Sequence, residues 1–300
     1  MTVTLDNGTL RLEVNPRVGG SVVRFDALTK SGAVALMRPG QASESDPNQL
    51  AMYPLVPWSN RIAGGGFHWR GNDYTFAAEL EGEPLPIHGD GWKREWHILE
   101  QTEQTLRLGL RSNEQPPFDY TAELCYCLNG TQLEVTLEVT HHGNTLVPYG
   151  LGLHPWFERR EGTRIEASAE GVWEVDAAQL PTRWRHIATG EAWDFAKART
   201  LPVDKIDNLF TGWNGHARLH LTQSNDLAQP GGALTLVVNA APTVSRYLVF
   251  SPDQNANFFC FEPVDHDVNA HHFDNPSAHG LVELAEGETH TYRCCFNWVS

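Results

Sequence analysis

The chain of 300 residues lacks any run of 18 apolar residues, and its first ten residues, MTVTLDNGTL, have neither the basic nor the apolar stretch of a signal peptide. A membrane-spanning helix needs such a run, and secretion needs such a leader. We therefore expect a soluble, cytoplasmic protein with no membrane partner.

Positive charge is also scarce. Lys and Arg number 22 against 37 Asp and Glu, which gives a net charge of −15 at pH 7. A field of this sign repels polyanions and anionic membrane surfaces. The sequence thus predicts no nucleic-acid partner and favours a small, uncharged ligand.

Cysteine is limited to five residues, an odd number without CxxC spacing. This usage fits a reducing compartment and argues against a disulfide framework. Cys125 and Cys127 lie two residues apart on a predicted strand and so share one face, where packing explains them better than a metal does.

Fourteen His residues are present, but their spacing does not suit a metal ion. His141 and His142 are adjacent on a strand and must point to opposite faces. His266, His271 and His272 lie in a polar loop without carboxylate or thiolate partners at a matching spacing. We predict neither a metal nor an organic cofactor, and expect His266 and Asp265 to form part of a cleft wall.

Helical periodicity is almost missing, and only short pieces such as Glu191–Ala198 show a period near 3.6. The dominant period is two, as expected for half-buried antiparallel strands. The alternation is clearest in Leu10–Val14, Leu106–Leu110, Tyr120–Leu128 and Leu133–Val139.

Further strands are predicted from apolar content and turn signals. They are Val22–Phe25, Trp96–Gln101, Ala217–Leu221, Ala233–Val238, Tyr247–Ser251, Phe258–Glu262 and Thr289–Trp298. Gly (26) and Pro (18) supply frequent turns between them. The fold class is therefore all-β, a large antiparallel β-sandwich of residues 1–300 as a single domain, with two smaller β domains as the alternative.

Two polar clusters come early in the chain. Pro57–Arg61 places Asn60 beside Arg61, a pair that can hydrogen-bond vicinal hydroxyls. Pro86–Trp92 places His88 before a glycine-rich turn, where a structural role is the simpler interpretation. Ten Trp residues fit either a core or a cleft that holds the apolar face of a sugar.

Two further clusters come later. Gly150–Phe157 delivers His154 on an apolar strand before Pro155, which keeps the backbone extended. Phe258–Pro263 carries Glu262 at the end of an aromatic strand, where a carboxylate is costly to bury unless it is paired or used. A structural ion pair is the alternative for Glu262. Ionisable groups in such surroundings have shifted pKa values, as working acids and bases do.

In this order, the motifs resemble those of the aldose 1-epimerases, also called galactose mutarotases. The motifs are Asn60-Arg61, His88-Gly89, His154-Pro155, Asp207 with Asn208-Leu209-Phe210, Glu262-Pro263, and the segment Gly280–Thr289. The resemblance covers nearly the whole chain. It implies a β-sandwich of the galactose mutarotase type that interconverts the α and β anomers of a free aldohexose.

The resemblance also implies roles for single residues. Glu262 is then the general base that takes the proton of the C1 hydroxyl, and His154 is the acid that protonates the ring oxygen. His88 donates a hydrogen bond near these atoms. Asn60, Arg61 and Asp207 bind sugar hydroxyls. Two opposed proton carriers suffice for this chemistry.

Other functions remain open at this point. The loop Asp90–Arg94 departs from the usual family pattern and is expected to border the sugar, so that Lys93 or Arg94 would suit a hexose 6-phosphate or another anionic sugar. A non-catalytic carbohydrate-binding protein would not need both Glu262 and His154. A glycosidase with Asp207 and Glu262 as its carboxylates would leave the histidines without a task. The preferred sugar stays open, as does the choice between monomer and homodimer.

Overall fold

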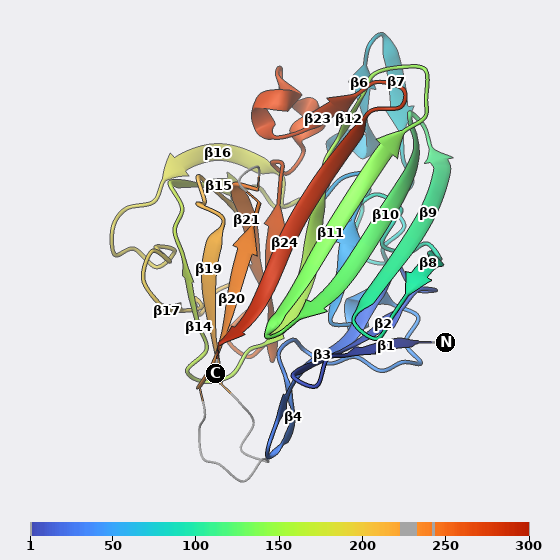
Figure 1. Ribbon diagram of the computed structural model, residues 1–300. Helices are drawn as coiled ribbons and strands as arrows, with labels where there is room; N and C mark the ends of the chain where they lie inside the picture. Colours follow the sequence, from blue (N-terminus) through green and yellow to red (C-terminus); the bar gives the residue numbers. More distant parts are fainter. Residues whose placement is uncertain (1, 223–232, 242–243, 300) are drawn as a thin grey trace.

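The computed structural model describes residues 2–222, 233–241 and 244–299, and these residues confirm the all-β prediction. Two large antiparallel sheets dominate the structure (Figure 1). In the described residues the helical segments are short 3₁₀ helices, namely Pro47–Gln49, Ala63–Gly65, Ala270–His272 and Pro276–His279. None of the described helices has the length and apolar character needed to cross a membrane.

The first sheet has 11 strands and carries the residues of most interest for function. Its strands, in spatial order, are β1 (Val3–Asp6), β2 (Leu10–Asn15), β3 (Ser21–Thr29), β5 (Met52–Leu55), β13 (Gly152–Glu158), β22 (Phe258–Val264), β21 (Arg246–Ser251), β18 (Ile206–Thr211), β15 (Gly171–Val175) and β16 (Pro181–His186), with β4 (Gly32–Ala35) paired to β3.

The second sheet has nine strands, and the long strands β9, β10, β11 and β24 lie side by side in it (Figure 1). Its order is β17 (Arg199–Thr200), β14 (Arg164–Ala167), β19 (His216–Thr222), β20 (Ala233–Ala240), β24 (Thr289–Val299), β11 (Gln132–His141), β10 (Phe118–Asn129), β9 (Thr105–Gln115) and β8 (His97–Gln101). Two small sheets pair β6 (Gly66–Trp69) with β7 (Asn72–Thr75), and β12 (Val147–Tyr149) with β23 (Val282–Leu284).

The main hydrophobic core lies between the two large sheets, and the alternating pattern of the sequence explains it. Leu124 of β10 pairs with Leu137 of β11, and both belong to the core, whereas the neighbouring Cys125 is only half-buried. Phe157 and Phe261 of the first sheet belong to the same core. Buttressing hydrogen bonds cross the layers, such as that from the Tyr292 hydroxyl to the Pro263 carbonyl at 2.9 Å.

Alternate residues of the first sheet point away from this core, because side chains alternate along a strand. Tyr53, Trp156, Leu248 and Cys260 form a second apolar cluster on that outer face. His154 and Glu262 have the same parity as Trp156 and Cys260 on their strands, and therefore share this face. The residues predicted to do chemistry thus lie outside the main core, over the middle of the first sheet.

The short segment with a period near 3.6 does not form a helix. Glu191–Ala198 forms turns instead of a helix. The Asp194 carboxylate accepts hydrogen bonds from the amides of Gly190 (2.7 Å) and Ala196 (3.1 Å), and Glu191 pairs with Arg185 at 2.7 Å. An Asp side chain that binds nearby amides in this way favours turns over a helix.

Candidate active site

A cavity of 230 Å³ opens on the outer face of the first sheet, and all six residues predicted for the site line it. The volume suits a ligand of the size of one sugar ring. We call this space the sugar cavity; its lining residues are Asn48, Tyr53, Asn60, Arg61, Leu80, Ile87, His88, His154, Trp156, Asp207, Phe250 and Glu262.

His154 and Glu262 face one another on adjacent strands. In the antiparallel pairing of β13 with β22, Gly152 is opposite Val264 and Trp156 is opposite Cys260. The register between these pairs places His154 opposite Glu262, and their side chains approach to 3.3 Å between Nε2 and Oε1. An imidazole and a carboxyl group, both able to carry a proton, thus lie across one strand pair in the lining of the cavity.

The His154 ring is held between two aromatic rings. It stacks on Tyr53 with ring centres 4.6 Å apart, and on Trp156 at 5.1 Å. The Tyr53 hydroxyl in turn donates to Oδ1 of Asn48 at 2.9 Å, which fixes the stack at the cavity edge. Burial between these rings lowers the pKa of His154 to about 3, because the imidazolium form loses its hydration.

Glu262 is 3% exposed, and its second oxygen, Oε2, is buried without a hydrogen-bond partner among the described residues. Burial raises the pKa of Glu262 well above its usual value, and the negative charge of Asp207 adds to the rise, while Arg61 opposes it. A buried carboxyl with an unused oxygen is costly to keep and is typical of a group that a ligand completes.

His88 and Asn60 are linked by two hydrogen bonds, one to the His88 ring and one between the backbones. The Asn60 amide donates to Nδ1 of His88 at 3.0 Å, and the His88 amide donates to the Asn60 carbonyl at 3.1 Å. Both residues adopt positive φ, 62° and 65°. The next residue, Gly89, has no room for a side chain, because a Cβ there would lie 2.4 Å from the Pro57 ring.

This arrangement sets the tautomer of His88. Since Nδ1 accepts a hydrogen bond, the proton of the neutral ring sits on Nε2, which is then a donor. Burial and the neighbouring His154 lower the pKa of His88 well below its usual range. His88 can therefore give a hydrogen bond to a sugar oxygen while staying neutral.

Arg61 and Asp207 form the charged side of the cavity. Arg61 Nη1 lies 3.6 Å from Asp207 Oδ2, and Arg61 Nε donates to Glu83 Oε2 at 2.7 Å. Lys205 lies 3.7 Å from the same Asp207 oxygen. Burial raises the pKa of Asp207, while Arg61 and Lys205 oppose that rise.

The expectation that the Asp90–Arg94 loop borders the sugar was wrong. Lys93 donates to the Glu79 carbonyl at 2.7 Å and lies 4.6 Å from the centre of the Trp92 ring. Arg94 pairs with Glu114 at 3.3 Å. Neither lines the sugar cavity. Their own partners hold both cations away from it.

His266 and Asp265 do not line the cavity either, although they were expected in its wall. They lie behind it. His266 Nε2 accepts a hydrogen bond from the Ser59 amide at 3.0 Å, and its Nδ1 donates to Asp265 Oδ1 at 2.9 Å. Gly150 makes room for this ring, because a Cβ there would approach it to 2.3 Å. The pair therefore anchors the segment that presents Asn60.

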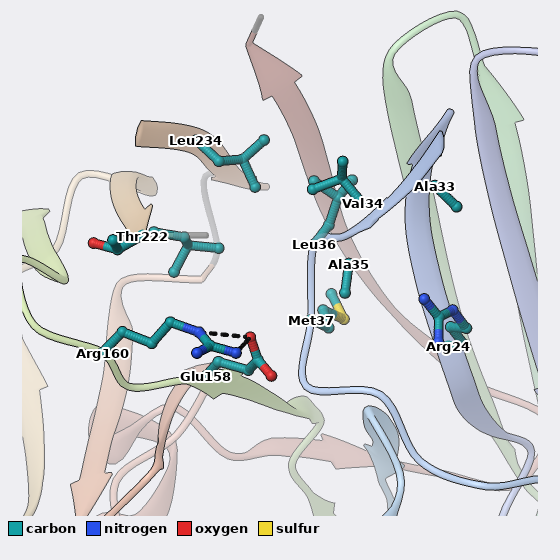
Figure 2. Close-up of a pocket in the computed structure, with 11 residues that line it drawn as sticks. Arg24, Ala33, Val34, Ala35, Leu36, Met37, Glu158, Arg160, Thr222 and Leu234 are labelled. Carbon is teal, nitrogen blue, oxygen red and sulfur yellow. Dashed lines mark hydrogen bonds and ion pairs between the residues drawn. The ribbon is translucent and has the colours of Figure 1, made fainter. Parts of the chain in front are cut away.

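A second hollow, of 240 Å³, lies at some of the same strands but contains none of the predicted site residues (Figure 2). It is lined by side chains such as Arg24, Leu36 and Met37, and by the ion pair of Glu158 with Arg160 at 2.9 Å. Both charges of that pair are satisfied by each other. Among the described residues of its lining, no histidine faces a carboxyl group as His154 faces Glu262.

In the part of the chain that the structure describes, one group of side chains has spacing compatible with a metal ion. It consists of His154, Cys260 and Glu262, whose donor atoms lie within 4.8 Å of one another. This juxtaposition is not apparent from the sequence, because Cys260 and Glu262 are two residues apart on β22 while His154 lies on the neighbouring strand β13. Cys260 is completely buried and does not line the cavity. That the protein uses no metal stays a prediction.

Other functional candidates were also missed, namely Asn48, Tyr53, Leu80, Glu83, Lys205 and Phe250. Tyr53 lies within the short apolar strand Met52–Leu55, and its sequence gives no sign that its ring covers a histidine. Tyr53 could have been found only from its pairing with His154 on the neighbouring strand, and this pairing is known only once the sheet order is known.

Fold and cavity together define a large β-sandwich with an acid–base pair over one sheet. The family model for aldose 1-epimerase matches residues 1–297, and the chain belongs to this family. The uncharacterized protein YphB of Escherichia coli (strain K12) is 32% identical over 298 residues, covering 97% of each chain.

Solved structures agree. A putative aldose 1-epimerase from Escherichia coli K12 superposes with a TM-score of 0.87 at 30% identity, covering 100% of this chain and 99% of the other. A galactose mutarotase-like protein from Clostridium acetobutylicum has the same fold, with a TM-score of 0.84 at 17% identity, covering 100% of this chain and 95% of the other. The fold is thus that of the galactose mutarotases, and the family supports an isomerase that acts on carbohydrates.

Proposed function

We propose that this protein is an aldose 1-epimerase that interconverts the α and β anomers of a free, neutral aldohexose such as galactose or glucose. The observation that carries the proposal is the approach of His154 to Glu262, 3.3 Å apart at the floor of a cavity the size of one sugar ring. The aromatic and aliphatic wall, including Trp156 and Phe250, suits the apolar face of a pyranose.

In the proposed reaction, Glu262 takes the proton of the C1 hydroxyl while His154 gives a proton to the ring oxygen. The bond between C1 and the ring oxygen breaks, and the C1 oxygen becomes the aldehyde oxygen. Rotation about C1–C2 then exposes the other carbonyl face. The C5 hydroxyl attacks it, returning its proton to His154 as Glu262 protonates the C1 oxygen, so the enzyme regains its starting state.

The pair needs one proton in total. Burial favours the neutral form of each group, which places this proton on Glu262 before the sugar arrives. Ring opening uses the state with the proton on His154. Transfer across the 3.3 Å between Oε1 and Nε2 supplies it without a change in net charge. The Nε2 proton of His88 would stabilise negative charge on a sugar oxygen.

Binding is proposed to rest on Asn60, Arg61 and Asp207, which present amide, guanidinium and carboxylate groups to sugar hydroxyls. An epimerase for an anionic sugar is the weaker proposal, because Lys93 and Arg94 have partners outside the cavity. A glycosidase is weaker too, since Arg61 and Lys205 neutralise Asp207. We further propose a cytoplasmic, cofactor-free enzyme that acts as a monomer or homodimer.

The test is a panel of freshly dissolved α-anomers followed by polarimetry, with the spontaneous rate in the same buffer subtracted. Acceleration with galactose or glucose supports the proposal. A binding module would leave every rate at its spontaneous value. A disaccharide in the panel detects a hydrolase by its release of monosaccharide. Conversion of phosphorylated or sulfonated sugars alone would favour the anionic alternative.

A further inference from the structure

We propose that Glu83 determines specificity: by neutralising Arg61, it makes the sugar cavity select neutral sugars over sugars with a negative charge. The inference rests on the proposed function of the cavity and names its substrate class. Glu83 comes from the segment between β7 and β8 and does not itself line the cavity. It acts through Arg61.

Arg61 is the one Arg or Lys among the described residues that line the sugar cavity. Its side chain is only 14% exposed, so its charge is weakly screened by water. An unpaired guanidinium in such a place would bind a carboxylate, sulfonate or phosphate through a bidentate pair. The neighbours of Arg61 therefore decide whether the cavity attracts anions.

Glu83 occupies the guanidinium from the side. Its Oε2 accepts from Arg61 Nε at 2.7 Å, and its Oε1 accepts from the Leu85 amide at 3.2 Å. The Glu83 side chain is 12% exposed. Since both carboxylate oxygens have donors, the group is held in place and its charge is matched to Arg61 at hydrogen-bond distance.

The pairing continues as a chain of alternating charges, from Glu83 to Arg61, Asp207 and Lys205. Its sum is zero. In the state that opens the ring, the charges of ionised Glu262 and protonated His154 cancel, so this pair adds no net charge to the cavity. Among the described residues that line the cavity, a substrate anion thus meets no Arg or Lys that lacks a carboxylate partner, while a neutral hexose can still use Arg61 N–H groups as hydrogen-bond donors.

The variant Glu83→Gln tests this by removing the charge while keeping the shape. The one acceptor oxygen of glutamine can keep the hydrogen bond of Arg61 Nε, but its NH2 group cannot accept from the Leu85 amide. Glu81→Gln is the matched control, because Glu81 is exposed on the same segment and forms no ion pair with any described residue. Circular dichroism and thermal unfolding establish that all three proteins are folded alike.

Galactose and galacturonate are the substrate pair, since they differ only in the C6 carboxylate. We expect Glu83→Gln to raise the ratio of kcat/KM for galacturonate to that for galactose by about tenfold or more over the wild type, with an effect that shrinks as salt is added. Glu81→Gln should change the ratio by less than about twofold. An unchanged ratio in Glu83→Gln, or an equal change in both variants, overturns the inference.

Binding of the same two sugars by titration calorimetry separates this inference from the proposed function. If the wild type turns over no sugar, the proposed function fails. The affinities still decide on Glu83, because the ratio of the two dissociation constants must shift toward galacturonate in Glu83→Gln. A shift confined to turnover, with both affinities unchanged, contradicts a role in selecting the ligand.

Discussion

Glu262 and Asp265 lie three residues apart, and both are less than 5% exposed, yet their surroundings have opposite effects. One oxygen of Glu262 has no partner among the described residues, and burial raises its pKa. Asp265 accepts from the Leu151 amide at 2.8 Å, from His266 at 2.9 Å and from His290 at 2.7 Å.

These donors reverse the effect of burial. Burial alone raises the pKa of Asp265, but the hydrogen bonds and charges of His266 and His290 together hold it below its usual value. Donors, more than depth, therefore decide whether a buried carboxyl is a structural anchor or a reactive group. The anchor supports the reactive group, because His266 also holds the Ser59 amide beside Asn60.

The largest effect is expected when the reactive pair is removed. Glu262→Gln and His154→Asn should each lower the rate of anomer interconversion by about 10²–10⁴-fold, the range for positioned acid–base groups. The double variant should be little worse than the poorer single variant, because neither group is useful alone. Rates for all four proteins are measured by polarimetry and corrected for spontaneous mutarotation.

Circular dichroism serves as the control for folding in that series. Losses that multiply in the double variant would show that the two residues act independently. Nearly full activity of His154→Asn would identify His88 as the more important acid, since it is the second histidine in the lining of the cavity and carries its proton on Nε2.

The second largest effect is expected on stability, when the structural carboxyl group Asp265 is replaced. Asp265→Asn replaces one acceptor oxygen by an NH2 group, which then faces the donors that Asp265 binds. Breaking a buried, charge-assisted network on one side destabilises proteins by about 3–5 kcal/mol. Urea unfolding measures this loss, and Glu262→Gln in the same assay should show no comparable loss. Equal losses would erase the distinction between the two carboxyl groups.

Of these two carboxyl groups, the sequence predicted the role of Glu262 but not that of Asp265. Period-two segments such as Leu133–Val139 identified the sandwich, and the apolar strand around Glu262 marked a carboxyl group that needs a reason for its burial. Asp265 and His266 were expected in the cleft wall, because nothing local shows that His266 turns toward Ser59, 207 positions earlier. Contacts between distant segments depend on sheet register, which a single sequence does not encode in its local pattern.

The same reason explains the misplaced Lys93–Arg94 loop. Its charges were visible in the sequence, but their partners, the Glu79 carbonyl and the Glu114 carboxylate, follow from how loops fold over the sheet edge. Glu83 was overlooked for the same reason. It is an ordinary acidic loop residue until the structure shows that it meets Arg61.

The pH dependence of stability should distinguish the two carboxyl groups by sign. Glu262 has a pKa raised above 4.5 in the folded state, so the wild type loses stability relative to Glu262→Gln as the pH rises from 4.5 through that raised value. Asp265 has a pKa lowered below 3.8, so its contribution is present above pH 3.8 and is lost as the pH falls through the lowered value.

Urea unfolding of the wild type and of both variants between low and neutral pH provides the measurement. The free energy of unfolding of Glu262→Gln should exceed that of the wild type increasingly above pH 4.5. The deficit of Asp265→Asn should be greatest at neutral pH and shrink below pH 3.8. Parallel curves for the three proteins would contradict the assigned pKa directions.

The smallest effect is expected from removal of metal ions. The donor atoms of His154, Cys260 and Glu262 lie within 4.8 Å of one another, so an ion bound there would take as a ligand the carboxylate that we propose as the base. A carboxylate that ligates zinc is a poor base, and the reaction needs only the two proton carriers. Activity should therefore survive exhaustive dialysis against a chelator, with elemental analysis before and after as the control. If turnover is lost and zinc restores it, Glu262 is a metal ligand. Like Asp265, it would then have its charge satisfied by permanent partners.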